Sequence, residues 1–302
     1  MYDVIIIGSG PAGFSAAIYT GRAKLKTLIL EAGVIGGNTA ITDLIDNYPG
    51  FPFGINGADL MENFHKQAER FGAELRLEEV ISLENVPEGK KVITSSGNEY
   101  IARAVIIAVG AKRKELGILG ENDFAGRGVS YCATCDGAFF HNAAVAVVGG
   151  GDSAVKEALY LAGIASRVYL IHRRDEFRAN PSAVDKLKAT DNIELKLNKV
   201  ITRIMGNNLM DTLIVKDVIS GTEEELQVEG LFISIGLVPA AEFLGGILST
   251  EDGYIVTNEK METTISGVFA AGDIRVKQAR QVATAVGDGV MAGIAVTEYL
   301  KE

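Results

Sequence analysis

The 302-residue sequence has only two cysteines and three histidines, and this scarcity argues against two kinds of site. A structural zinc ion needs about four ligands, and the three histidines, His65, His141 and His172, have no paired ligand spacing. A disulfide-rich secreted framework needs several bridges, whereas two cysteines allow only one. We therefore expect no metal site and no disulfide scaffold.

Long hydrophobic runs and an excess of positive charge are missing as well. No apolar run approaches the roughly 20 residues that span a bilayer, and the N-terminus lacks a basic stretch, a hydrophobic signal core and a cleavage site. The 29 basic and 39 acidic residues leave a net charge of −10, which argues against nucleic acid as the main partner. The sequence thus predicts a cytoplasmic protein with no membrane or nucleic-acid partner. Its length favours about two domains.

Both cysteines belong to one CATC segment, in which Cys132 and Cys135 are followed at once by Asp136. The two-residue spacing lets both sulfurs meet in a small ring. A cysteine in such a pair often has a lowered thiol pKa and attacks a partner disulfide as the thiolate. A structural zinc site and a structural disulfide are the alternatives, although a bridge across so short a loop would restrict the unfolded chain little. The pattern favours a reactive dithiol.

A glycine-rich turn near the N-terminus predicts a dinucleotide site. It follows an apolar strand at 2–7, precedes a helix-like stretch to about residue 23, and contains Gly8, Gly10 and Gly13. Such glycines permit a tight turn and close approach of a pyrophosphate, while the free N–H groups of the helix face the phosphates. A second strand at 27–30 ends in Glu31, whose carboxylate suits ribose hydroxyls. A merely structural glycine turn is the alternative.

The arrangement is repeated in the middle of the chain, where strand 145–148 leads into the turn GGGDSA at 149–154 and a helix to about residue 162. Such a duplication predicts a second nucleotide domain. The next strand, 167–171, ends at a basic cluster of His172, Arg173 and Arg174, with Arg178 one helical turn further on. Guanidinium groups suit a 2′-phosphate, so we expect NADPH rather than NADH. A solvated basic turn is the alternative.

The remaining patterns indicate a small β insertion in each nucleotide fold, around the turns at Gly97 and Gly221, and a helix over about 58–71. Near the C-terminus, a buried-strand pattern at 268–271 ends in Gly272 and Asp273, and Arg280 and Gln281 open a long helix. Asp273 is placed either to bind a ribityl hydroxyl and phosphate or to form a common turn.

Taken together, the motifs resemble those of the low-molecular-weight, bacterial-type thioredoxin reductases, over residues 2–300. They are GSGPAG at 8–13, NYPGF at 47–51, CATCDG at 132–137, GGGDSA at 149–154, HRR at 172–174 with Arg178, and GDIR at 272–275 followed by RQV at 280–282. The resemblance implies an α/β fold of two Rossmann-like three-layer ββα nucleotide-binding domains, the second inserted in the first. An FAD-binding domain would comprise 1–112 and 241–302, and an NADPH-binding domain 113–240 would carry the dithiol.

The resemblance also implies the cofactor-binding residues. Those for FAD are Gly8, Gly10, Gly13, Glu31, Gly37, Asn38, Asn47, Gly272, Asp273, Arg280 and Gln281. Those for NADPH are Gly151, Asp152, Ser153, Ala154, His172, Arg173, Arg174 and Arg178. Three positions depart from the family pattern: Asn38 replaces a usual glutamine, Val109 a threonine and Ala240 an asparagine. Each loses or shortens a polar group, which could alter FAD affinity, FAD potential or the domain equilibrium.

The family reaction passes hydride from NADPH to FAD, then electrons to the Cys132–Cys135 disulfide and finally to oxidised thioredoxin through a mixed disulfide. The resemblance implies that Cys135 faces the flavin, that Cys132 attacks thioredoxin and that Asp136 moves protons, although Asp136 could also be a turn or cap residue. It further implies a homodimer.

Three other functions stay open. A ferredoxin-dependent sister enzyme would not need the arginine set. The reductase component of a hydroperoxide-reducing system would carry an added N-terminal domain, whereas the first glycine turn here starts at Gly8. A flavin-bound redox sensor would use the same dithiol without turnover.

Overall fold

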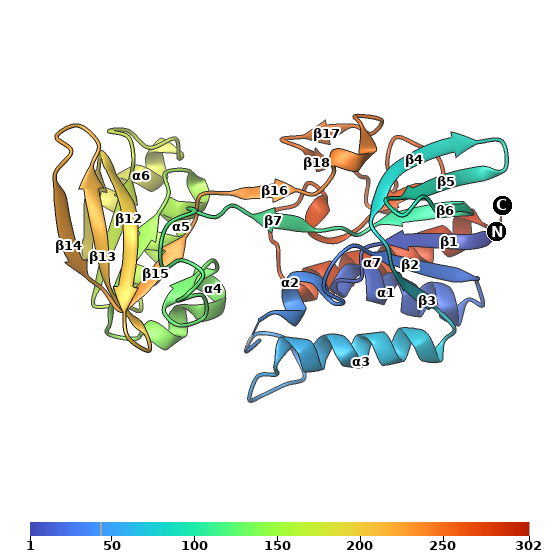
Figure 1. The fold of residues 1–302 in the computed structure, drawn as a ribbon, viewed down its shortest axis with the longest axis horizontal. Helices are drawn as coiled ribbons and strands as arrows, with labels where there is room; N and C mark the ends of the chain where they lie inside the picture. Colours follow the sequence, from blue (N-terminus) through green and yellow to red (C-terminus); the bar gives the residue numbers. More distant parts are fainter. Residues whose placement is uncertain (43, 302) are drawn as a thin grey trace. The chain divides into compact units, whose positions relative to one another are not determined.

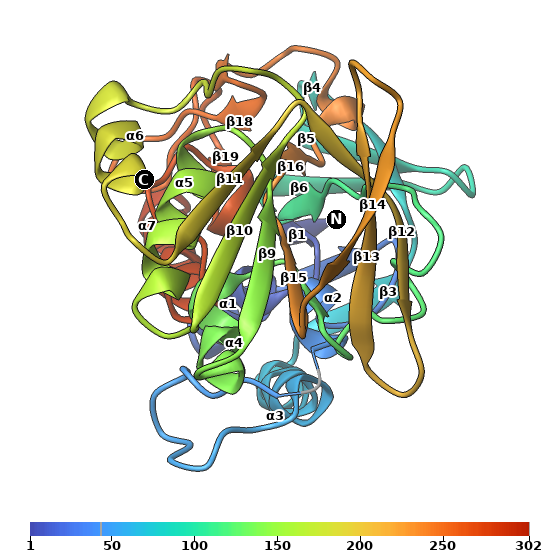
Figure 2. The same ribbon diagram turned by 90° about the vertical axis from the view of Figure 1, so that its left-hand side faces the viewer.

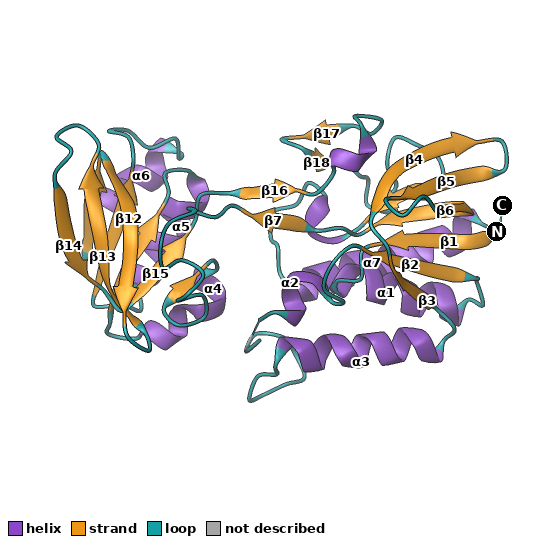
Figure 3. Cartoon of the chain, in the orientation of Figure 1, coloured by secondary structure: helices purple, strands orange, loops and turns teal. Residues whose placement is uncertain are grey.

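The computed structural model describes residues 1–42 and 44–301, which fall into two units (Figure 1). Unit 1 consists of Met1–Lys112 and the segment from Val238 to the C-terminus, and unit 2 is the continuous segment Arg113–Leu237. Unit 2 is therefore an insertion in unit 1. Two short paired strands, β7 (Ala111–Arg113) and β16 (Leu237–Pro239), lie where the chain passes between the units. Figure 3 shows the helices and strands of each unit.

Unit 1 is built on a sheet in which β3, β2, β1 and β6 lie side by side in parallel, with β19 next to β6. The bounds of these strands are Tyr2–Ile7 for β1, Thr27–Glu31 for β2, Glu74–Leu77 for β3, Glu99–Ile107 for β6 and Val268–Ala270 for β19. The first part of β6 pairs with an antiparallel hairpin of β4 (Val80–Val86) and β5 (Gly89–Thr94). The turn at Gly97 joins β5 to β6, as expected for a small insertion, and β4 adds a further strand to it.

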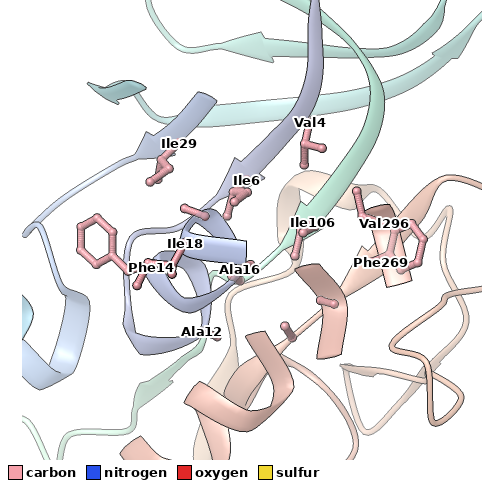
Figure 4. Close-up of a cluster of buried hydrophobic side chains, with 14 of the residues drawn as sticks. Val4, Ile6, Ala12, Phe14, Ala16, Ile18, Ile29, Ile106, Phe269 and Val296 are labelled. Atoms are coloured by element: carbon pink, nitrogen blue, oxygen red, sulfur yellow. The ribbon is translucent and has the colours of Figure 1, made fainter. Parts of the chain in front are cut away.

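Both faces of the unit 1 sheet are buried, which explains why β1 is apolar after its second residue. Successive side chains point to opposite faces, so Val4 and Ile6 join one hydrophobic cluster and Ile5 and Ile7 join another. Figure 4 shows the first cluster, in which Val4, Ile6 and Phe14 lie among other apolar side chains. Helices cover that face: α1 (Pro11–Arg22), α3 (Gly57–Arg70) and α7 (Val282–Tyr299).

The shorter elements of unit 1 connect these layers. They are α2 (Gly37–Ala40), η2 (Glu242–Leu244), β17 (Thr250–Glu251), β18 (Tyr254–Ile255) and η3 (Gly272–Ile274). The second cluster packs the β4–β5 hairpin and residues after β16 against the far face of the sheet, through Leu83, Val92 and Leu244 among others. Unit 1 therefore has the three-layer ββα order expected from the sequence.

Unit 2 repeats this plan with a parallel sheet in the order β11-β10-β9-β15-β8. The strands are β8 (Val129–Ser130), β9 (Ala144–Val148), β10 (Arg167–His172), β11 (Ile193–Leu197) and β15 (Gly230–Ile233). In Figure 2 the helices α5 (Asp152–Ala162) and α6 (Pro181–Lys188) lie on one side of this sheet. A second sheet of β12 (Lys199–Gly206), β13 (Met210–Asp217) and β14 (Glu223–Gln227) lies on the other.

Strand β9 shows the same alternation as β1. Val145 and Val147 pack toward the helices, whereas Ala146 and Val148 pack toward the second sheet. Two short helical turns, α4 (Ala133–Asp136) and η1 (Gly137–Phe140), follow β8. The fold class predicted from the sequence is confirmed in both units.

Two local expectations were wrong or incomplete. The segment after His172 contains bends and no helix, so Arg178 is not one helical turn beyond the basic cluster. Its backbone N–H donates instead to the Gly150 carbonyl at 2.8 Å, which holds this segment against the glycine turn. The sequence also gave no sign of β14, a strand that pairs antiparallel with β13. Among the described residues, no helix is both long and apolar enough to span a bilayer.

Candidate active site and nucleotide sites

The two cysteines form a disulfide, with 5.3 Å between their Cα atoms. The single turn of α4 brings them together, because the Cys135 N–H donates to the Cys132 carbonyl at 3.1 Å. The intervening Ala133 is fully buried in the unit 2 core and anchors this turn, whereas both cysteines are partly exposed. The disulfide is thus held by the fold and still open to a partner.

Asp136 lies directly beside the disulfide loop. Its backbone N–H donates to the Cys132 carbonyl at 3.1 Å, and its side-chain Oδ2 accepts a hydrogen bond from the Ser130 hydroxyl at 2.5 Å. Over the described part of the chain, its side chain caps neither α4 nor η1. The cap alternative therefore finds no support in a side-chain hydrogen bond, and the Ser130 hydroxyl joins the carboxylate to the Cys132 N–H.

Ser130 was not singled out by the sequence, yet it joins the parts of this site. It is the last residue of β8 and is 5% exposed. Its hydroxyl donates to Asp136 and accepts the Cys132 N–H at 3.1 Å. The available signal was a small polar residue at the end of a buried strand, two positions before the first cysteine.

A buried carboxylate binds Tyr131, the residue between Ser130 and Cys132. Glu121 is 2% exposed and accepts the Tyr131 hydroxyl at 2.9 Å together with the backbone N–H groups of Leu116 and Gly117, at 3.0 and 2.8 Å. Burial, followed by the neighbouring Glu121, raises the pKa of Tyr131 above its ordinary value. The phenol therefore stays a neutral donor, and it ties the residue before Cys132 to the first segment of unit 2.

The first glycine turn has the shape that a pyrophosphate requires. A Cβ on Gly13 would lie 2.0 Å from the Gly8 carbonyl oxygen, and Gly8 itself has a φ of +103°. Helix α1 begins after Gly10 without a side-chain cap, and a Cβ on Gly10 would meet nothing closer than 4.0 Å. There is thus open space at the N–H groups of this helix start, which fits a bound phosphate.

Glu31 ends β2 beside this turn, as expected, and Ser9 holds it there. The Glu31 Oε2 accepts both the backbone N–H and the hydroxyl of Ser9, at 2.8 and 2.7 Å, and Oε1 accepts the Gly33 N–H at 2.9 Å. Ser9 is fully buried and also accepts the Gly36 N–H at 3.0 Å. Because a carboxylate oxygen accepts more than one bond, Oε1 keeps capacity for a ribose hydroxyl.

This arrangement predicts the effect of replacing Ser9 with alanine. The variant loses the hydroxyl donor to Glu31 and leaves the buried Gly36 N–H without its acceptor, which typically costs about 1 to 3 kcal/mol. We expect the Kd for FAD to rise about tenfold, measured by titrating apoprotein with FAD. Ser96→Ala, at an exposed turn of unit 1, is the control. A variant that melts earlier but binds FAD normally would contradict a role in the nucleotide site.

The two distant segments expected to bind FAD meet in unit 1. The Asn47 side-chain amide donates to Gln281 Oε1 at 3.1 Å, which links the loop before α3 to the start of α7. Gln281 caps α7 in a reciprocal pair with Thr284. The guanidinium of Arg280 lies 4.1 Å from the centroid of the Tyr254 ring, and its Nε is 3.4 Å from the Asp273 carbonyl oxygen.

The structure also shows what the shortened Asn38 does. Its amide donates to the Ala111 carbonyl at 3.1 Å, so the asparagine still makes a polar contact near the end of the first unit 1 segment.

The turn at Gly272 depends on Asp288, another residue not expected from the sequence. Asp288 accepts the Gly272 N–H at 3.1 Å and forms ion pairs with Arg275 and Lys277, at 2.9 and 2.8 Å.

In unit 2 the second glycine turn packs on His172. A Cβ on Gly150 would lie 2.0 Å from the His172 ring, so the glycine leaves room for this side chain. His172 is 5% exposed, stacks on Phe177 with 5.3 Å between ring centroids, and has its Nε2 3.1 Å from the Glu176 carbonyl oxygen. Burial lowers the pKa of His172. The structure thus places a neutral ring beneath the turn, as a support for it.

The three arginines differ from His172 because their side chains are exposed at the carboxyl end of β10. None of the guanidinium groups of Arg173, Arg174 and Arg178 forms an ion pair with another described residue. In the turn itself, Asp152 Oδ1 accepts the Asn180 N–H at 2.8 Å, Ser153 is exposed and Ala154 is buried in the core. The three arginines are therefore exposed, and the Arg178 N–H joins their segment to the glycine turn through the Gly150 carbonyl.

Glu157 on α5 carries an unusual carboxyl group. Its Oε2 is buried and has no hydrogen-bond partner among the described residues. Burial raises the pKa of Glu157 from 4.5 to about 7, against the lowering effects of Ser234 and Arg113. The folded protein therefore holds this proton at a pH at which the unfolded chain has released it.

The stability of the protein should consequently fall as the pH rises from about 4.5 to about 7, and this loss should be absent in Glu157→Gln. Between pH 5 and pH 8, the free energy of unfolding of the unchanged protein should therefore fall by about 2 kcal/mol relative to that of the variant. Urea denaturation of both proteins without nucleotide measures this difference. Equal pH dependence in the two proteins would show that Glu157 does not hold the proton.

Comparisons with known proteins show the family to which this chain is similar. A sequence model of the pyridine nucleotide-disulphide oxidoreductase family matches residues 2–289. The thioredoxin reductase of Bacillus subtilis (strain 168) is 46% identical, with all of this chain and 96% of that protein covered. The thioredoxin reductase of Treponema pallidum (strain Nichols) is 42% identical, with 99% of this chain and 97% of that protein covered.

A solved structure agrees over the same length. The crystal structure of thioredoxin reductase from Streptococcus pyogenes MGAS5005 superimposes with a TM-score of 0.95 at 42% identity, covering 100% of this chain and 98% of that one. FAD and NADPH are the cofactors typical of these enzymes. The chain therefore belongs to the pyridine nucleotide-disulphide oxidoreductase family and, within it, to the low-molecular-weight thioredoxin reductases.

Proposed function

We propose that this protein uses NADPH to reduce the disulfide of thioredoxin, by way of FAD and its own Cys132–Cys135 disulfide. The observation that carries the proposal is the partly exposed disulfide with the Asp136 carboxylate held beside it. Two nucleotide-type glycine turns, one in each unit, support it. The relatives named thioredoxin reductase match over the whole chain, so thioredoxin is the proposed substrate.

The residues of unit 1 fit FAD, since the uncapped start of α1 and the open space at Gly10 suit the pyrophosphate, and Glu31 suits the ribose. When bound, FAD would supply a two-electron carrier between the nicotinamide and the disulfide. The full proposed FAD set is Gly8, Gly10, Gly13, Glu31, Gly37, Asn38, Asn47, Gly272, Asp273, Arg280 and Gln281. For NADPH we propose Gly151, Asp152, Ser153, Ala154, Arg173, Arg174 and Arg178, with His172 supporting their turn.

The exchange with thioredoxin needs a reduced Cys132–Cys135 pair. The Cys132 thiolate attacks one sulfur of the thioredoxin disulfide, a Cys132–thioredoxin bond forms, and the released thioredoxin thiolate takes up a proton. Cys135 then attacks the Cys132 sulfur, which restores the Cys132–Cys135 bond and releases the second thioredoxin thiolate, again with uptake of a proton. We propose Asp136 as the group that delivers these protons. The two protons of the reduced cysteine pair are thus transferred to the two thiols of thioredoxin.

Steady-state NADPH oxidation with oxidised thioredoxin present and absent tests this function. We expect turnover that requires thioredoxin and prefers NADPH to NADH. A flavin that ferredoxin reduces and NADPH does not would instead support the ferredoxin-dependent alternative, against which the unpaired arginine cluster argues. Oxidation that stops after stoichiometric reduction would support a redox sensor.

We also propose that the protein is a homodimer in the cytoplasm, as its resemblance to the family implies. Light scattering during gel filtration should then give twice the 32.1 kDa mass of one chain. A mass of one chain at micromolar concentration would contradict the dimer. The cytoplasmic location stays a prediction.

A further inference from the structure

Ser130 has a position that the fold fixes closely. It ends β8, the edge strand of the unit 2 sheet, where it lies in register with Phe232 of β15. Phe232 is fully buried, and Ser130 is itself 5% exposed. The backbone that carries the serine is therefore anchored in the core, immediately before the disulfide loop.

The hydroxyl of Ser130 joins two parts of that loop. Its single proton is donated to Asp136 Oδ2 at 2.5 Å, and its oxygen accepts the Cys132 N–H at 3.1 Å. A hydroxyl has only one proton to donate, so rotation of the side chain away from Asp136 would give up the bond to the carboxylate. The serine thus sets the direction of the Asp136 carboxylate and the position of the first cysteine together.

We propose that Ser130 is a positioning residue for the thiol exchange, which acts by holding the Asp136 carboxylate beside the cysteine pair. The inference rests on the proposed function, in which Asp136 delivers protons to the departing thiolates. Without the hydroxyl, the carboxylate would lose its partner on the sheet and turn among several rotamers. Proton delivery would then succeed in a smaller fraction of encounters.

The test measures the two half-reactions separately in Ser130→Ala, Asp136→Asn and the double variant. In the first, NADPH reduces the FAD-loaded protein without thioredoxin. In the second, the NADPH-reduced protein meets a range of oxidised thioredoxin concentrations without oxygen, and thiols formed on thioredoxin are followed. We expect Ser130→Ala to leave the first rate unchanged and to lower the maximal rate of the second about tenfold, a typical loss for one charge-assisted hydrogen bond.

The double-mutant cycle separates this role from a general structural one. In the Asp136→Asn background, Ser130→Ala should slow the exchange less than about twofold, because the carboxylate it holds is already gone. Ser130→Thr, which keeps a hydroxyl, should restore the rate to within about threefold of the unchanged protein. Ser220→Ala, at an exposed turn of unit 2, is the control and should behave like the unchanged protein.

An equal loss from Ser130→Ala with and without Asp136 would overturn the proposal, since the serine would then act through the Cys132 backbone alone. A full exchange rate in Ser130→Ala, or a Ser130→Thr variant as slow as Ser130→Ala, would also overturn it. If the unchanged protein fails to reduce thioredoxin, the proposed function fails and this inference falls with it. That failure is seen before any variant is compared.

Discussion

Replacing Cys135 with serine is expected to lower thioredoxin-dependent NADPH oxidation at least about a thousandfold. The chain has no cysteine beyond Cys132 and Cys135, and these two are bonded to each other. The variant therefore cannot form the disulfide that accepts electrons, nor release thioredoxin from a mixed disulfide by internal attack. Steady-state NADPH oxidation with oxidised thioredoxin measures the loss.

Two controls show that this loss reflects chemistry and not misfolding. Reduction of the bound flavin by NADPH should persist in Cys135→Ser, because the proposed nucleotide residues are intact. Ala138→Ser, which adds a hydroxyl at an exposed position of η1, should retain nearly full turnover. A Cys135→Ser variant with normal thioredoxin reduction would mean that electrons reach thioredoxin by another route.

Replacing both Arg173 and Arg174 with alanine should raise the KM for NADPH about a hundredfold and change the KM for NADH less than about twofold. Each lost hydrogen bond between a guanidinium and the 2′-phosphate typically costs about 1.5 to 3 kcal/mol. NADH has no such phosphate. Both side chains are exposed at the end of β10, so their removal should leave the core of unit 2 intact. Steady-state kinetics with both nucleotides measure the change in preference.

Arg167→Ala is the matched control, because Arg167 is an exposed arginine at the opposite end of β10 and lies 3.8 Å from Glu194. It should keep the NADPH preference. An equal loss with NADPH and NADH in the double variant would show that the arginines do not recognise the 2′-phosphate. No loss at all would place the phosphate elsewhere and require the electron donor to be reassigned.

The main elements of both units could be predicted because buried strands have a simple hydrophobic pattern in the sequence. Strands β1 and β9 are covered on both faces, so they are continuous apolar runs, and a glycine turn follows each. Strand β14 has no such hydrophobic pattern, since it begins with three glutamates and buries only Leu226. Its Glu224 is stabilised by Lys196 and Lys199, at 3.7 and 3.3 Å, which are contacts that only the folded chain makes.

The site was predictable where function depends on spacing, and less so where it depends on contacts between distant segments. The pair at Cys132 and Cys135 forms the expected disulfide. Ser9 and Glu121 act through hydrogen bonds to residues that the sequence pattern does not connect with them, so neither was expected. His172 carries the right chemistry for a phosphate, but its burial under the glycine turn gives it a different position from the arginines that follow it.

The most direct test of the electron path is to count free thiols without oxygen, first after adding NADPH to the FAD-loaded protein and then after adding oxidised thioredoxin. The path predicts that NADPH reduces the Cys132–Cys135 disulfide to two free thiols. Oxidised thioredoxin should then oxidise these two thiols back to the disulfide and gain two thiols of its own. If NADPH exposes no thiols, or if the exposed thiols persist in the presence of oxidised thioredoxin, the disulfide is not on the path and the proposed function is wrong.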